Sequence, residues 1–393
     1  MKEDFFEIIM AGVITPWLIV NRTGTQTTPR NLRVFACQGL YSRDATTATY
    51  VLNDANDLWW LQSTGGAGPI LPAGKTVTED QFVSSCLAKF GRYLRYNATA
   101  QQELLPLVST LAGVLDAIPL EDDAIAALAS AGASMVFDAV ATFAGFSELN
   151  ATAYVFDHWG NRTTGLAKLN PGWRWDSKIA DTFKPTLTGG VQTKLTDYIV
   201  KERLFNFFLK DGCIPLTQEH ALLERMLLSS AAFWPRPHVV FGYDNSHPLF
   251  GGDLFEAESS CSKEHSMGQV ASEGVTNLAY FSSDHTVTTP LLQLADPPIE
   301  YNSSRTYIAF IIGDGDNVAY VQGSRSGWMK DRARRCKAGG GAANRTACFP
   351  LVWSIQPHLL HMAPAWLRWF YQVGTSTGAD PFLFWLFLPL YIL

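Results

Sequence analysis

Apolar residues are arranged along the chain in two different patterns. Up to residue 234, stretches with helical spacing alternate with short apolar runs; beyond it, short continuous apolar runs are separated by connections of helix length. Apolar residues three and four apart indicate a helix face, whereas a short continuous run indicates a strand buried on both sides. The proline-rich segment Trp234–Pro237 separates the two regions with these patterns. The pattern therefore predicts two domains, 1–234 and 235–393.

In the first domain the pattern predicts both helices and strands. The expected strands are Leu32–Cys37 and Thr152–Phe156. The expected helices are Glu103–Ile118, Ala124–Phe143, Thr196–Lys210 and Glu219–Ser230.

In the second domain the apolar runs predict a series of buried parallel strands. The expected strands are His238–Tyr243, Thr276–Phe281, Tyr307–Ile312, Leu351–Ile355 and Phe382–Trp385. Their spacing predicts an α/β fold, either a β/α barrel or an open α/β sheet.

Composition and charge argue against several classes of protein. Charged residues make up 17% and aromatic residues 12% of the 393 residues, which excludes an intrinsically disordered chain. The net charge is −6 and no basic stripe is visible, so no nucleic-acid partner is expected. No apolar run reaches the roughly 18 residues of a membrane helix, so no stable membrane span is expected.

Glycosylation signals point to the secretory pathway. The Asn-x-Ser/Thr sequence occurs at Asn21, Asn97, Asn150, Asn161, Asn302 and Asn344, and N-glycans are expected at some of these. The first residues are acidic and give no evident signal peptide. We nevertheless expect a secreted or secretory-pathway protein, because an even number of cysteines also fits an oxidising compartment. Cys336 and Cys348 bracket a glycine-rich loop, which predicts a disulfide between them.

The sharpest chemical signal is the segment Tyr307–Asn317, an apolar run that ends in Asp-Gly-Asp-Asn. Side chains two apart on a strand point the same way, so Asp314 and Asp316 can converge on one ligand. The carboxyl end of a parallel strand is where α/β folds place their sites. A plain turn is the alternative, since Asp-Gly is a common turn former. The spacing does not fit a calcium-binding EF-hand, but it does fit the Asp-x-Asp of a metal-dependent glycosyltransferase.

A second polar cluster follows the expected strand at 238–243. Tyr243, Asp244 and Asn245 come at its end, with Glu256 and Glu258 a short distance on. Together with Asn317 and Trp353, the first three residues are expected to bind substrate. No metal-ligand spacing is present, and neither a metal nor an organic cofactor is expected.

Several blocks resemble the GxGYxYP putative glycoside hydrolase family. The most specific is Phe310–Asn317 with its Asp-Gly-Asp-Asn. Val270–Ser282 is similar to the family's Ala-Ser-(acid)…Asn-Leu-Ser block, with Ala279 in place of the serine, and Val352–Pro364 is similar to its Trp-x-Ile-x-Pro…Ala-Pro segment. Leu18–Arg22 resembles Gly-Leu-Val-Asn-Arg, and Leu111–Ala117 resembles the family's Leu-Ala-Gly helix.

The resemblance implies an architecture. An amino-terminal region of divergent α/β repeats, here about 1–80, 81–147 and 148–234, is expected to precede a β/α barrel at 235–393. The family's named motif should follow Asp380-Pro381-Phe382 but is absent, so we expect an incomplete, truncated barrel.

The resemblance also implies catalytic roles. The family's two aspartates carry over to Asp314 and Asp316, and its glutamate carries over best to Glu256, with Glu258 as the second choice. We expect a glycoside hydrolase acting on a poly- or oligosaccharide, with Glu256 as the acid and the aspartates activating water, which would give inversion. The alternatives are a carbohydrate-binding protein without catalysis, an inactive truncated enzyme, and the metal-dependent glycosyltransferase.

Overall fold

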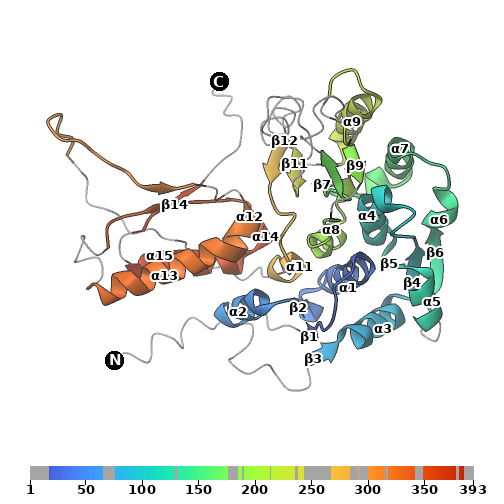
Figure 1. Cartoon of the computed structure of the whole chain (residues 1–393), viewed down its shortest axis with the longest axis horizontal. Coiled ribbons are helices and arrows are strands. Elements are labelled where there is room, and N and C mark those ends of the chain that lie inside the picture. Colours follow the sequence, from blue (N-terminus) through green and yellow to red (C-terminus); the bar gives the residue numbers. More distant parts are fainter. Residues whose placement is uncertain are drawn as a thin grey trace.

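The chain is a mixed α/β protein in a computed structural model (Figure 1). The structure describes residues 17–64, 76–128, 132–175, 185–187, 190–212, 214–234, 238–242, 267–283, 291, 300–313, 315, 317–340, 348–377 and 380–384. Strand pairs are parallel apart from the short antiparallel pair β8 (Trp173–Trp175) and β9 (Pro185–Leu187). None of the helices within these ranges is long and apolar enough to cross a membrane.

Two small sheets form the amino-terminal part. The first has the order β2-β1-β3, and the second has the order β5-β4-β6. Their strands are β1 (Leu18–Asn21), β2 (Thr49–Leu52), β3 (Thr76–Thr78), β4 (Arg92–Arg95), β5 (Ile118–Leu120) and β6 (Ser134–Asp138). The associated helices are α1 (Thr28–Tyr41), α2 (Ala55–Ser63), α3 (Glu79–Phe90), α4 (Leu105–Leu115), α5 (Asp122–Leu128), α6 (Ala139–Thr142) and α7 (Glu148–Trp159).

A third sheet crosses the expected domain boundary at residue 234. Its order is β10-β7-β11-β12, so strands from both sides of the boundary pair directly. The strands are β7 (Leu166–Lys168), β10 (Phe205–Phe207), β11 (His238–Phe241) and β12 (Met267–Val270), and the helices between them are α8 (Thr196–Glu202) and α9 (Gln218–Ser229). The domain limits themselves remain predictions.

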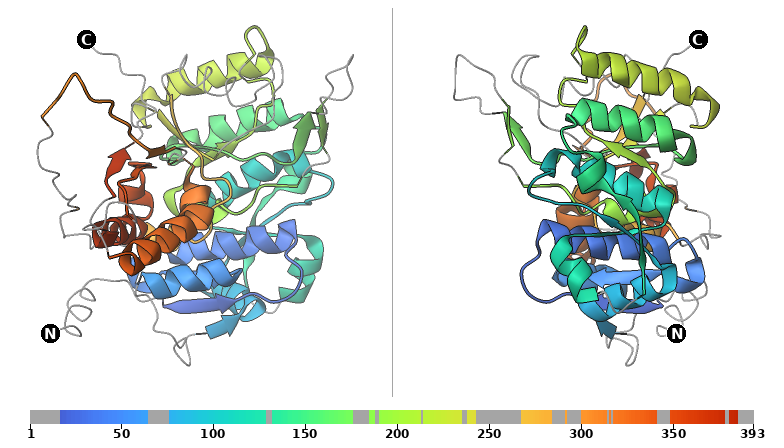
Figure 2. Two further views of the ribbon diagram at one scale, coloured as in Figure 1. Left: turned by 60° about the vertical axis from the view of Figure 1, so that its left-hand side comes forward. Right: turned by 90° about the vertical axis from the view of Figure 1, so that its right-hand side faces the viewer.

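The fourth sheet has the order β13-β14-β15 and carries the carboxyl-terminal part. Its strands are β13 (Ile311–Ile312), β14 (Val352–Ile355) and β15 (Phe382–Phe384). The helices of this part are α11 (Leu278–Phe281), α12 (Val318–Tyr320), the π-helix Val321–Arg325, α13 (Ser326–Ala338), α14 (Leu359–Met362) and α15 (Pro364–Thr377). In Figures 1 and 2, α13 and α15 lie beside α2 from the other end of the chain.

Five of the expected elements were wrong in type or extent. Leu32–Cys37 lies inside α1, and Thr152–Phe156 lies inside α7, whose amino end is capped by the Ser147 hydroxyl. The expected helix 124–143 is instead the end of α5 at Leu128, the strand β6 and the short α6, with Gly132 at φ +69° just before β6. The expected helix 196–210 ends where Arg203 adopts φ 54°, and β10 follows. Thr276–Phe281 contains the helical turn α11, and the strand lies earlier, at β12.

Other expectations agree with the structure. Glu103–Ile118 and Glu219–Ser230 correspond to α4 and α9, and the strand starting at His238 corresponds to β11. β14 and β15 lie in the runs at 351–355 and 382–385. The expected buried strand Tyr307–Ile312 agrees only in part. It pairs only at Ile311–Ile312, and the expected burial is wrong, because Ile308 is 74% exposed and Ile311 is 54% exposed.

Asn277 joins the first sheet to the carboxyl-terminal part. Its Oδ1 accepts from Val51 N at 2.8 Å, and its Nδ2 donates to Val51 O at 2.9 Å. The side chain therefore binds the outer edge of β2 as a neighbouring strand would. Trp60 of α2 and Trp366 of α15 also pack together there, with ring centroids 5.0 Å apart.

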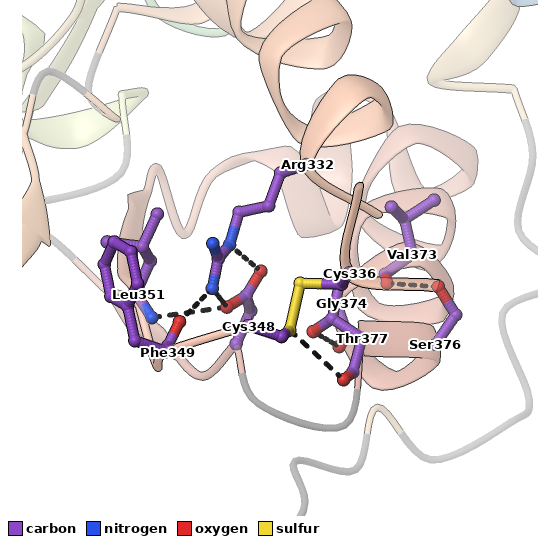
Figure 3. The surroundings of a disulfide bond; sticks show 10 residues. Arg332, Cys336, Cys348, Phe349, Leu351, Val373, Gly374, Ser376 and Thr377 are labelled. Carbon is purple, nitrogen blue, oxygen red and sulfur yellow. Dashed lines mark hydrogen bonds and ion pairs between the residues drawn. A yellow bond between two sulfur atoms is a disulfide. The ribbon is translucent and has the colours of Figure 1, made fainter. Parts of the chain in front are cut away.

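Two disulfides lie among the described residues. Cys336 and Cys348 are bonded with sulfurs 2.04 Å apart, which confirms that expectation (Figure 3). Beside them, Arg332 binds the buried Asp380 through two hydrogen bonds of 2.7 Å. The second disulfide joins Cys37 of α1 to Cys86 of α3.

Candidate functional site

The turn after β13 is built around Gly315. A Cβ on Gly315 would lie 2.0 Å from the carbonyl oxygen of Ser354 in β14, so only glycine fits. Gly315 N donates to the Ser354 hydroxyl at 2.8 Å, and that hydroxyl donates to Ile312 O at 2.9 Å. Ser354 therefore fixes both sides of the turn that carries Asp314 and Asp316.

Two further side chains hold the same turn. Arg325 donates to the carbonyl of Gly313 and, at 3.2 Å, to the carbonyl of Ser354. Asn317, expected to bind substrate, is half-buried, and its Oδ1 accepts from Tyr320 N at 3.1 Å as the cap of α12. That oxygen serves the cap, and the Nδ2 group is the hydrogen-bond donor that Asn317 offers to a site.

The end of β12 lies next to this turn. Val318 N donates to the carbonyl of Ala271 at 2.8 Å. Ser272, the next residue, accepts from Gly242 N at the end of β11, at 3.0 Å. Gly242 has φ +93°, and a Cβ there would lie 2.3 Å from the carbonyl of Lys168 at the end of β7. The carboxyl ends of β7, β11, β12 and β13 are thus brought close together.

Glu273 is the carboxyl group at this edge that the sequence did not single out as catalytic. Burial raises its pKa above the usual range, against the opposing effect of backbone hydrogen bonds from Glu273 and Ser272. Its Oε2 is buried, with no hydrogen-bond partner in the described part of the chain. A carboxyl group whose pKa is raised by burial is a potential general acid. In the sequence, Glu273 could have been found from its position as the acid of the Ala-Ser-(acid) block.

The end of β14 adds a histidine. His358 Nδ1 lies 3.1 Å from Gln356 Oε1, and its ring faces Phe241 of β11 edge-on at 6.4 Å. Burial, and then the nearby His361, lower the pKa of His358, which favours the neutral imidazole. Trp353, expected to bind substrate, is 3% exposed and packs in the core, so its ring face is not open to a sugar.

Six of the expected site residues lie outside the described residues: Tyr243, Asp244, Asn245, Glu256, Asp314 and Asp316. Among the residues that are described, no group of three or more His, Cys, Asp or Glu side chains is arranged to hold a metal ion.

A family model and a solved structure match this chain, and the family match agrees with the motifs found in the sequence. Residues 304–384 match the model of the GxGYxYP putative glycoside hydrolase C-terminal domain, which confirms the resemblance for that segment. A crystal structure of a putative hydrolase from Bacteroides thetaiotaomicron is similar, with a TM-score of 0.67 and 18% sequence identity. The alignment covers 95% of this chain and 63% of that one, so this chain spans less than two thirds of that protein. No curated protein matches.

Proposed function

We propose that the protein is a glycoside hydrolase whose site lies at the turn 313–317. The observation that carries the proposal is that the family match at 304–384 covers this turn and its support on Ser354 and Arg325. A turn held from several sides is what a catalytic pair of carboxylates needs, because small misplacements cost large factors in rate.

The proposed mechanism divides the work between two kinds of carboxyl group. Asp314 and Asp316 hold and deprotonate the attacking water, and a protonated glutamate donates to the leaving oxygen. The sequence favours Glu256 as that acid. Glu273 is a further candidate beside Glu258, because its Oε2 is buried at the neighbouring strand end and burial raises its pKa. Attack by water gives inversion.

The wider setting is also proposed. The fourth sheet is taken as part of a β/α barrel at 235–393, and the region to residue 234 as divergent α/β repeats, with the third sheet joining the two. A secreted location with N-glycans on some of the six signals is supported by the disulfides Cys37–Cys86 and Cys336–Cys348.

The test is release of reducing sugar from a panel of poly- and oligosaccharides. We expect D314N and D316N to lower the rate by roughly a hundredfold or more, as loss of acid–base groups does. Of E256Q and E273Q, the variant that removes the acid should lose activity on natural glycosides, and a substrate with a good leaving group, which needs no proton from the acid, should be hydrolysed at close to the wild-type rate. E300Q, a change at an exposed glutamate, is the control.

The outcome of this assay separates the alternatives. Activity unchanged in both D314N and D316N would contradict the proposal. Glycan binding without turnover would indicate a carbohydrate-binding protein. Turnover that needs a nucleotide sugar and stops on chelation would indicate a glycosyltransferase. The anomer released first, followed by NMR, tests inversion.

A further inference from the structure

We infer that Asp57 of α2 is a positioning residue for the turn 313–317, acting through Thr276 and Gln322. Its catalytic meaning rests on the proposed function, whereas the mechanical link can be measured without any substrate. The link runs from the first sheet, through the loop after β12, to the π-helix Val321–Arg325.

The first step is the set of contacts around Asp57, which is 1% exposed. Its Oδ1 accepts from the Thr276 hydroxyl at 2.7 Å and from Asn277 Nδ2 at 2.9 Å. Its Oδ2 accepts from the backbone N and the Nδ2 of Asn53, both at 2.9 Å. One carboxylate thus joins the end of β2 to the loop after β12.

The second step joins that loop to the π-helix. Gln322 Oε1 accepts from Thr276 N at 3.2 Å, and Gln322 Nε2 donates to Thr276 O at 3.1 Å. The same Nε2 lies 3.2 Å from the Thr276 hydroxyl oxygen, whose own hydrogen goes to Asp57. The backbone of Gln322 is held by α2 as well, because its carbonyl accepts from Trp60 Nε1 at 2.6 Å.

The third step reaches the turn. Arg325 belongs to the same π-helix, and it donates to the carbonyls of Gly313 and Ser354. Here Gly323, with φ −94° and ψ −107°, interrupts the helix between Gln322 and Arg325. Contacts on both sides of that interruption are therefore needed to fix where Arg325 points.

Hydrogen–deuterium exchange of the peptides covering 311–325 and 352–356 tests this link. We expect D57A and Q322A to speed exchange there by about tenfold, because the Gly315 N–H loses its fixed acceptor geometry. Q101A is the matched control: its Nε2 also donates to a backbone carbonyl, Ala139 O at 2.8 Å, but far from the turn.

D57N separates positioning from general stability. An asparagine keeps an acceptor for Thr276 and Asn277 but turns an amide toward the two donors of Asn53. We therefore expect D57N to lose global stability, measured by urea unfolding, while protection at 311–325 stays close to wild type. Where hydrolysis is measurable, D57A should lower kcat with little change in KM, and D57N should restore most of it.

Three results would overturn the inference. One is unchanged exchange in Q322A. Another is an equal rise in the exchange rate of the same peptides, 311–325 and 352–356, in Q101A. The third is a D57N effect at the turn that simply follows the loss of global stability. If no glycan is hydrolysed but the exchange pattern holds, the proposed function fails and the link stands.

Discussion

Glu79 and Asp197 are both buried carboxylates, but their surroundings differ. Glu79, at the start of α3, contacts Arg22 at 3.1 Å, Arg30 at 2.9 Å and Arg33 at 3.5 Å. Asp197, in α8, is fully buried and accepts from Ala279 N at 2.9 Å. One carboxylate is surrounded by guanidinium groups, and the other mainly by backbone.

The two pKa values move in opposite directions. Burial raises the pKa of Glu79, but the hydrogen bond from Arg30 and the charge of Arg22 outweigh it, so the pKa lies below its usual value. Burial dominates at Asp197 and raises the pKa to about 7, despite hydrogen bonds from the backbone of Ala279 and Tyr198. Burial alone does not decide the charge of a carboxyl group; the number of cations in contact with it does.

The largest expected effect comes from removing the charge of Glu79. E79Q leaves the guanidinium of Arg22, with a side chain 1% exposed, without a counter-charge. We expect a loss of about 3–5 kcal/mol in the free energy of unfolding, measured by urea denaturation. D80N, a change at the adjacent acid whose side chain is 87% exposed, should cost less than about 0.5 kcal/mol. Equal costs for the two would show that the arginines do not depend on Glu79.

The next prediction concerns the pH dependence of stability. The folded pKa of Asp197 exceeds the unfolded value, so the folded state binds more protons between about pH 4 and 7 and stability falls as the pH rises. The slope reaches at most about 1.4 kcal/mol per pH unit. D197N, which keeps an acceptor for Ala279 N, should flatten this slope in unfolding measurements across the window.

Glu79 gives the opposite control for that experiment. Its folded pKa is depressed, so its contribution is complete above the unfolded value and is lost as the pH falls through the folded value. E79Q should therefore change the acid limb below about pH 4.5 and leave the slope between pH 5 and 7 intact. If D197N leaves that upper slope unchanged, Asp197 is not its source.

The smallest expected effect is a gain in the free energy of unfolding, from the substitution A279S. The Asp197 Oδ1 is buried, with no hydrogen-bond partner among the described residues. Ala279, whose N–H reaches the other oxygen, stands where the resembling family has serine. A279S should supply a hydroxyl to Oδ1 and stabilise the fold by about 1 kcal/mol, measured as above. A112S, at a buried alanine of α4, should destabilise; a loss in A279S as well would show that the hydroxyl does not reach.

Sequence reasoning succeeded where local pattern decides structure. β11, β14 and β15 are short apolar runs, and α9 begins at the capping residue Thr217. It failed where tertiary packing overrides local preference. Residues 34–41 of α1 are all buried, so the helix lacks a polar face that would give it helical periodicity. Thr152–Phe156 has β-branched and aromatic residues, but its cap at Ser147 starts a helix.

The candidate site was predictable only in part. The Asp-Gly-Asp segment identifies a turn after a strand, and the disulfide Cys336–Cys348 joins two cysteines that are 12 residues apart in the sequence. The support of that turn depends on Ser354, 39 residues away, which no local pattern reveals. Glu273 was visible only as one acid in a block, because its burial arises from packing against distant elements.

The outer edge of β2 also bears on how the chain avoids self-association. At Thr49, the carbonyl accepts from Gln38 Nε2 at 3.0 Å and the N–H donates to the Ser42 hydroxyl at 3.4 Å. At Val51, both groups bind Asn277. An edge strand whose outward backbone groups are occupied by side chains cannot serve as a template for a strand of another molecule. Side chains of α1, of the segment that follows it and of the loop after β12 therefore protect the β2 edge of this sheet from aggregation.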